Sequence, residues 1–233
     1  MKNKNLAGEI ISFYRDLEFD GKLPEGIRIM NPFHAPEIIS AITEFYTRYY
    51  SDNRQRHIIL GINPGRFGAG VTGIPFTDTV RLREKCGIKI PDLKSFETSS
   101  VFIYEMIDRY GGPEKFYGDF YISSVSPLGF TSEGKKGKEI NFNYYDSREL
   151  TESILGFAVE TIWKQIAFGI NRETCFCLGT GKNFRFLSEL NKEHHFFNRV
   201  IPLEHPRFIM QYRLKSKEHY IETYLEKFRI AIS

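Results

Sequence analysis

Residues 57–76 read HIILGINPGRFGAGVTGIPF. A short apolar run, residues 57–60, leads into a glycine-rich turn that begins at Asn63-Pro64-Gly65. Because glycine lets a backbone approach a ligand closely and expose its N–H groups, this pattern predicts a ligand-binding loop behind a buried strand. A phosphate-binding loop and a simple tight turn both stay open at this point. A Walker loop and a dinucleotide-binding fingerprint are excluded by the spacing of the glycines and lysines.

Three more apolar runs end in polar turns in the same way. They lie at residues 120–125, 174–178 and 200–203, and they stop at Ser126-Pro127, Gly179-Thr180-Gly181 and His205-Pro206. Since parallel strands carry their ligand site beyond their carboxyl ends, we expect these turns to meet at one rim of a sheet. The pattern therefore predicts where a ligand site lies, but not which reaction takes place there.

Helical periodicity fills the intervals between these runs. It is seen at residues 6–17, 101–110, 150–168 and 216–230, from Pro36 onward and after Gly181, and a further short strand is expected at residues 26–30. Short apolar strands that alternate with helices predict an α/β fold, with a central parallel four-stranded sheet and helices on both faces. No repeat or long linker divides the chain, so we expect residues 1–233 to form a single domain.

The composition excludes several classes of protein. The chain has 233 residues, of which 41% are hydrophobic and 26% charged, so it is neither disordered, collagen-like nor a coiled coil. A net charge of +3 permits a nucleic-acid partner without requiring one. The three cysteines are too few for an iron–sulfur cluster and odd in number, and we expect no metal or cofactor. Without a signal peptide or a membrane span, the chain is expected to be cytoplasmic, or nucleoid-associated if it is bacterial.

Taken as a whole, the glycine-rich stretch resembles the first motif of the uracil-DNA glycosylase superfamily, and most closely that of its single-strand-selective monofunctional (SMUG) branch. That motif runs G-M-N-P-G-P-F-G and then T-G-V-P-F, and the residues in register are Asn63, Pro64, Gly65, Phe67, Gly68, Thr72, Gly73, Pro75 and Phe76. Further elements follow the family order: Asn31-Pro32 resembles its upstream N-P element, residues 124–128 occupy the place of its N-x-C-P-L, and His205-Pro206 opens its second motif. The resemblance spans roughly residues 26 to 213.

The resemblance implies that Asn63 and His205 are catalytic. Asn63 would hold a water molecule near the sugar, because an oxocarbenium-like sugar needs only a weak nucleophile. His205, as a neutral imidazole, would donate a hydrogen bond to the carbonyl oxygen of the departing base as negative charge builds there. The flipped base would bind to the backbones of Ile62 and Gly65, beneath the ring of Phe76 and beside Ser124.

Two positions depart from the family pattern. Ser124 stands where the family has an asparagine, and a small hydroxyl that rotates to suit its partner reads a base less strictly than an amide. This predicts a pocket that accepts uracil and also bulkier deaminated purines such as xanthine or hypoxanthine. Arg66 replaces a proline of the motif, and it is a candidate DNA contact together with Arg207 and Arg213. Residues 207–213 are expected to form the loop that inserts into DNA.

The sequence thus predicts a monofunctional DNA glycosylase that acts as a monomer on single- and possibly double-stranded DNA with damaged bases. No lysine is placed as a Schiff-base nucleophile, so lyase activity is not expected. Two alternatives stay open. A mismatch-specific branch of the superfamily also carries Gly-Ile-Asn-Pro-Gly, although its second motif lacks His-Pro. The chain could also bind nucleic acid, or a small nucleotide, without cleaving it.

Overall fold

The computed structural model describes residues 5–232, apart from the side chain of Lys136. Its elements follow in the order α1 (Leu6–Arg15), β1 (Ile27–Met30), η1 (Pro32–His34), α2 (Pro36–Tyr50), β2 (His57–Gly61), α3 (Ala69–Thr72), α4 (Thr79–Cys86), α5 (Thr98–Tyr110), α6 (Pro113–Asp119), β3 (Phe120–Ser124), β4 (Gly129–Glu133), η2 (Lys135–Gly137), β5 (Glu139–Phe142), α7 (Arg148–Ile166), β6 (Asn171–Leu178), α8 (Lys182–His194), β7 (Arg199–Leu203), α9 (Pro206–Tyr212), η3 (Leu214–Ser216) and α10 (Lys217–Ile232). All four strands expected for the main sheet are present.

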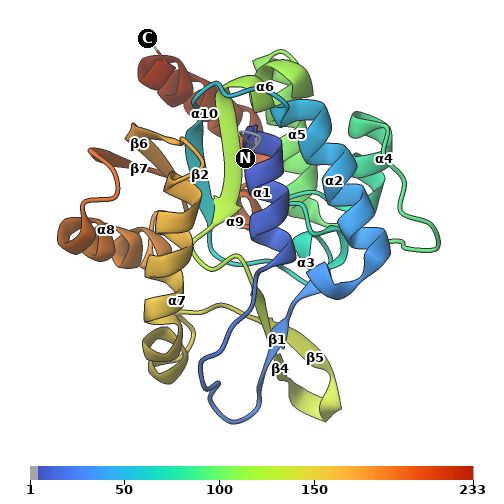
Figure 1. The fold of residues 1–233 in the computed structure, drawn as a ribbon, viewed down its shortest axis with the longest axis vertical. Helices are drawn as coiled ribbons and strands as arrows, with labels where there is room; N and C mark the ends of the chain where they lie inside the picture. The colour runs from blue at the N-terminus through green and yellow to red at the C-terminus, as the bar shows by residue number, and fades with distance from the viewer. Residues whose placement is uncertain (1–4, 233) are drawn as a thin grey trace.

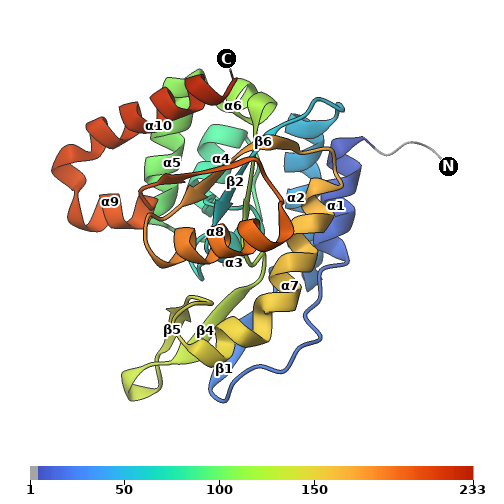
Figure 2. The same ribbon diagram turned by 90° about the vertical axis from the view of Figure 1, so that its left-hand side faces the viewer.

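The main sheet has four strands in the order β3-β2-β6-β7, and all of its pairs are parallel. Figure 2 shows it between helices α1, α2 and α7 on one side and α5 and α10 on the other. The predicted α/β class and the helices on both faces are therefore confirmed. Pro202 lies within β7, which pairs with β6 alone, and an edge strand tolerates a residue that has no N–H to donate.

Neighbouring residues of β3 show how the sheet is packed on both faces. The ring of Phe120 lies 4.4 Å from that of Phe228 on α10, whereas the hydroxyl of the next residue, Tyr121, donates to that of Tyr14 on α1. Successive side chains of a strand point to opposite faces, so a strand that is buried on both sides is apolar throughout. This explains why the four runs stand out in the sequence.

A second sheet, which is antiparallel and has the order β1-β4-β5, lies below the main sheet in Figure 1. The expected strand at residues 26–30 is its β1, but β4 and β5 were not predicted. These two strands carry Thr131, Glu133 and Glu139 and are largely exposed at their outer ends, so they lack a continuous apolar signal. After β5 the chain returns to the rim of the main sheet, and this return shapes the site described below.

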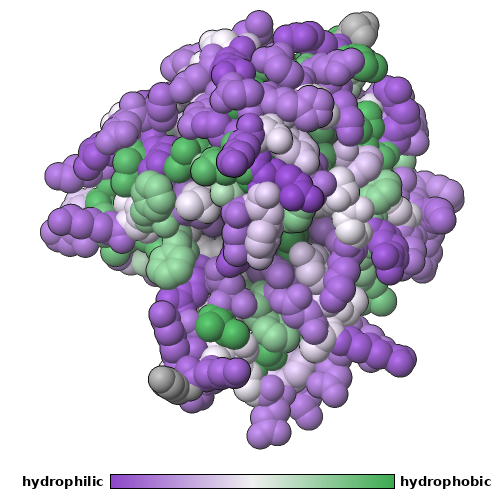
Figure 3. All heavy atoms as spheres, turned by 180° about the vertical axis from the view of Figure 1, so that it is seen from behind, coloured by the Kyte–Doolittle hydropathy of each residue, from purple (hydrophilic) through white to green (hydrophobic). Residues whose placement is uncertain are grey.

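Hydrophilic side chains cover most of the face seen from behind, and hydrophobic ones gather there only in small patches (Figure 3). Within residues 5–232, no helix combines the length and the apolar character needed to cross a membrane. The same residues contain no cluster of three or more histidine, cysteine or acidic side chains suited to a metal ion.

Candidate active site

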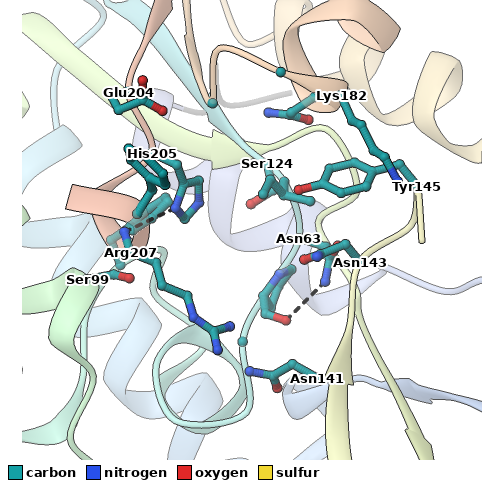
Figure 4. Close-up of a pocket in the computed structure, with 18 of the residues that line it drawn as sticks. Asn63, Ser99, Ser124, Asn141, Asn143, Tyr145, Lys182, Glu204, His205 and Arg207 are labelled. Carbon is teal, nitrogen blue, oxygen red and sulfur yellow. Dashed lines mark hydrogen bonds between the residues drawn. The ribbon is translucent and has the colours of Figure 1, made fainter. Parts of the chain in front are cut away.

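A cavity of about 560 Å³ lies at the carboxyl ends of the main strands. Its lining includes residues from all four strand ends: Ile62 and Asn63 after β2, Ser124 of β3, Gly179, Thr180 and Gly181 after β6, and Glu204 and His205 after β7. The expected meeting of the turns at one rim is observed. The glycine-rich loop supplies one wall, and residues 141–145, after β5, supply another (Figure 4).

Asn63 uses its side chain to bind the chain segment that follows β5. Its Nδ2 donates to the carbonyl oxygens of Phe142 at 3.2 Å and Pro64 at 3.3 Å, and its Oδ1 accepts from the backbone N–H of Tyr144 at 3.1 Å. Both N–H donors of the amide are used in this way. One lone pair of Oδ1 is left, so the remaining capacity of Asn63 in the cavity is that of a hydrogen-bond acceptor.

His205 stands at the end of β7 and caps helix α9. Its Nδ1 accepts from the backbone N–H of Arg207 at 3.1 Å, which places the proton of the neutral ring on Nε2. Burial among the pocket walls lowers the pKa of His205 to about 4, and the nearby charge of Arg207 acts in the same direction. The ring is therefore neutral at physiological pH, with an N–H donor available to the cavity.

Phe76 adopts a backbone conformation that is rare for an aromatic residue. Its φ is +52°, in the left-handed region, and such strain concentrates at functional sites. The ring lies 5.8 Å from that of His205, and a Cβ on Gly61 would come within 2.9 Å of it. The turn thus holds the ring of Phe76 against the floor of the cavity beside His205.

Ile62, Gly65 and Ser124, the other residues expected to bind the base, all line the cavity. Ser124 is 6% exposed, and no hydrogen bond of its hydroxyl to another described residue is seen. A Cβ on Gly65 would lie 3.1 Å from Oε1 of Glu97, so a larger residue there would press on this carboxyl group. Glycine at position 65 thus allows the glycine-rich loop to lie close to Glu97.

The three candidate DNA-binding arginines take different positions. Arg207 lines the cavity and extends across it toward Asn141 (Figure 4). Arg66 instead donates to the carbonyl oxygen of Glu139 and lies over the ring of Phe67 at 4.7 Å, outside the cavity lining. Arg213 is also outside it, and its guanidinium lies over the ring of Phe208 at 5.4 Å. Only one of the three reaches the cavity.

The expected inserting loop at residues 207–213 is wrong in its conformation, because residues 206–212 form helix α9. Pro206 has the fixed φ that suits the first helical position, His205 caps the first turn, and Ile209 is buried against the core. This helix start can be recognised in His-Pro itself. Exposed apolar side chains remain at its end, with Tyr212 60% and Leu214 57% exposed.

The sequence interpretation missed the wall formed by residues 141–145. Asn141, Asn143 and Tyr145 line the cavity from this segment. Tyr144 between them is held at three points: its N–H by Asn63, its carbonyl by Thr151 at 3.0 Å, and its hydroxyl by Asn183 at 2.6 Å. The sequence signal that could have shown this wall is the alternation of amide and aromatic residues in NFNYY.

Glu97 is a titratable group of the cavity that the sequence interpretation also missed. It lines the cavity next to the glycine-rich loop, and its Oε2 accepts from Ser100 Oγ at 3.3 Å. Burial raises the pKa of Glu97 to about 7, the charge of Asp78 acts in the same direction, and Arg207 opposes them. Burial therefore favours the protonated form of this carboxyl group more than in an exposed glutamate.

Comparison with known proteins identifies the family of the chain. The family model described as the uracil DNA glycosylase superfamily matches residues 47–229, so the chain belongs to that superfamily of DNA glycosylases. A solved structure, the wild-type SMUG2 of Pedobacter heparinus, shares 53% sequence identity and superposes with a TM-score of 0.95. The match covers 97% of this chain and 98% of the other, and the resemblance to the SMUG branch is thereby confirmed. No curated protein matches the chain.

Proposed function

We propose that the protein is a monofunctional glycosylase that hydrolyses the N-glycosidic bond of uracil, and of other deaminated bases, in DNA. The observation that carries this proposal is the convergence of Asn63 and His205 on one cavity beside Phe76 and Ser124. A cavity of about 560 Å³ accommodates one nucleotide turned out of the stack. We further propose a single-domain enzyme that acts as a monomer on one flipped nucleotide.

The role proposed for Asn63 follows from its remaining acceptor site. A water molecule that donates one hydrogen to Oδ1 keeps a lone pair free for the anomeric carbon of the sugar. The amide does not remove a proton in this step. It orients the water while positive charge develops on the sugar, and orientation of a nucleophile is itself a large contribution to rate.

His205 acts on the other product of bond cleavage. As the glycosidic bond to uracil breaks, its electron pair passes to the base, and negative charge builds on the carbonyl oxygen next to the broken bond. The Nε2–H of the neutral imidazole donates to this oxygen. A donor held in place before the charge develops stabilises the transition state more than the substrate. Lys182 lines the cavity with its ammonium group over the ring of Tyr145. We propose that it does not act as an amine nucleophile, so no strand cleavage is expected.

Ser124 is proposed to set the range of bases. Its hydroxyl, which is open to the cavity, can donate to a carbonyl or accept from a ring N–H. Uracil, xanthine and hypoxanthine all carry both groups, whereas an asparagine would present a fixed pattern and occupy more space. A pocket of this kind takes deaminated pyrimidines and purines alike.

The experiment measures base release from single- and double-stranded oligonucleotides that contain one uracil, xanthine or hypoxanthine. We expect the wild-type protein to leave an abasic site without cutting the strand. We expect Asn63→Ala and His205→Ala each to slow uracil release by about a hundredfold or more. Ser124→Asn should retain uracil release and lower that of xanthine and hypoxanthine.

Absence of release from every oligonucleotide, with DNA binding retained, would favour a binding protein over an enzyme. Strand cleavage at the abasic site would contradict the monofunctional mechanism. An unchanged range of bases in Ser124→Asn would remove Ser124 as the residue that sets it.

A further inference from the structure

One side chain of the cavity, that of Tyr145, has no role in the mechanism proposed above. Tyr145, in the segment after β5, lies across the cavity from His205, with Ser124 between them (Figure 4). Its ring points inward, and its hydroxyl is directed toward Ser124. Since His205 approaches one end of a bound base, the hydroxyl of Tyr145 is placed at the opposite end.

The ring of Tyr145 is held firmly. Tyr144, which hydrogen-bonds to three other residues, packs edge-on against it with the ring centroids 5.1 Å apart. The ammonium group of Lys182 lies over the ring, 5.7 Å from its centre. A half-buried aromatic side chain with two such neighbours has little freedom to turn away. Its hydroxyl therefore has a defined position in the cavity.

This hydroxyl forms no hydrogen bond to another described residue. Because it faces the cavity, its hydrogen-bonding partner there is water or a bound molecule. Burial raises the pKa of Tyr145 to about 12, so the phenol stays protonated and can donate. Such an unused donor, aimed into a cavity on a fixed ring, is typical of a ligand contact.

We propose that the Tyr145 hydroxyl hydrogen-bonds to the edge of the flipped base that faces away from His205, and so takes part in selecting the base. This inference rests on the proposed glycosylase function. In uracil the far edge carries a carbonyl oxygen and a ring N–H, and xanthine and hypoxanthine present the same pair. Ser124 and Tyr145 then read this edge together, with two hydroxyl groups in place of one amide.

The test compares Tyr145→Phe with the wild-type protein in single-turnover release of uracil from a single-stranded oligonucleotide. Because one hydrogen bond to the base is lost, we expect release to slow by about five- to tenfold. The ring and its contacts with Lys182 stay, so the melting temperature and the affinity for an oligonucleotide without damage should not change. Tyr220→Phe on α10, which removes the same atom outside the cavity, is the matched control.

A second comparison tests whether the two hydroxyls share one edge. If they do, the losses caused by Tyr145→Phe and Ser124→Ala should not add in the double variant. Uracil release at the wild-type rate by Tyr145→Phe would overturn the inference and leave the proposed function standing. So would a parallel fall in melting temperature and in binding of undamaged DNA, since this marks a structural role. Failure of the wild-type protein to release any base would instead refute the proposed function.

Discussion

Two side chains of the cavity, Asn63 and His205, use some of their donor and acceptor atoms in hydrogen bonds to the backbone. Asn63 gives both N–H donors to backbone carbonyls, and His205 gives its Nδ1 to the first turn of α9. What remains to each is one function: an acceptor on Asn63 and a donor on His205. These are the two functions that water orientation and stabilisation of the leaving base require, which is why we assign the roles in this sense and not the reverse.

The lowered pKa of His205 also predicts how stability depends on pH. An unfolded histidine titrates near 6.5, whereas in the folded protein this group titrates at about 4. Between these values the unfolded chain binds the additional proton, so the contribution of His205 to stability is complete above pH 6.5 and is lost as the pH falls toward 4. Glu97, with its raised pKa, contributes in the opposite direction between about 4.5 and 7.

The measurement is the free energy of unfolding at several pH values for the wild-type protein and for His205→Asn. Asparagine keeps an acceptor for the helix cap but does not titrate. The difference in stability between the two proteins should therefore change between pH 4 and 6.5 and stay constant above it. A difference that is independent of pH throughout would show that the ring of His205 titrates normally.

At the scale of elements, the cavity depends on contact between the glycine-rich loop and the small sheet. Gly129, at the start of β4, lies where a Cβ would be 2.7 Å from the carbonyl oxygen of Pro64 and would also overlap the side chain of Met30. Asn141 accepts from the backbone N–H of Arg66 at 3.0 Å on the same side. The small sheet thus supports the loop that carries Asn63.

Gly129→Ala is expected to push β4 away from this loop. Overpacking of this kind costs about 1–3 kcal/mol, and release of uracil should fall because Asn63 moves with its loop. Gly156→Ala on α7 is the control, since no atom lies within 4 Å of its added Cβ and alanine favours the helix by about 0.5–1 kcal/mol. Denaturant unfolding and single-turnover release measure both effects. Equal stability of the two variants would show that the contact is not tight.

Over the whole molecule, charge is distributed unevenly although the net charge is only +3. The cavity at the ends of the main strands is lined by two cations, Arg207 and Lys182, and by two acids, Glu97 and Glu204. A second cavity, between α1, the chain that follows it and α7, is lined by an excess of acids over its single cation, Lys164: Glu9, Asp16, Glu18, Asp20 and Glu160. A polyanion is thus repelled more strongly at the second cavity than at the first, which orients its approach.

Arg207→Ala is therefore expected to weaken binding of a single-stranded oligonucleotide and to reduce the salt dependence of binding by about one phosphate contact. Arg213→Ala should have a smaller effect, because this guanidinium lies outside the cavity against Phe208. Arg148→Ala on α7, an exposed arginine paired with Glu152, is the control. Fluorescence anisotropy at several salt concentrations gives the slopes. A slope for Arg207→Ala equal to that of the control would exclude a phosphate contact.

The amino-acid sequence alone was enough to predict the main sheet and the rim at which the site lies. Buried strand segments such as residues 58–60 are apolar on both faces, and the strands end at turn residues. Each such strand can therefore be recognised from a short stretch of sequence. The motif around Asn63 and the His-Pro pair could also be compared with the family from the sequence alone, because each consists of residues that are close together in the chain. Helix α9 was misjudged, although His205-Pro206 carries the signal of a helix start.

The wall that contains Tyr145 emerged only from the folded chain. Its strands, β4 and β5, are short and partly exposed, and its position depends on hydrogen bonds to Asn63 and Asn183 from distant parts of the sequence. Three further features were visible only in the folded chain: the occupied N–H groups of Asn63, the neutral ring of His205 and the outward placement of Arg66. Each depends on which groups meet in space and how well water is excluded from them, and neither property can be read from residues that are neighbours in sequence.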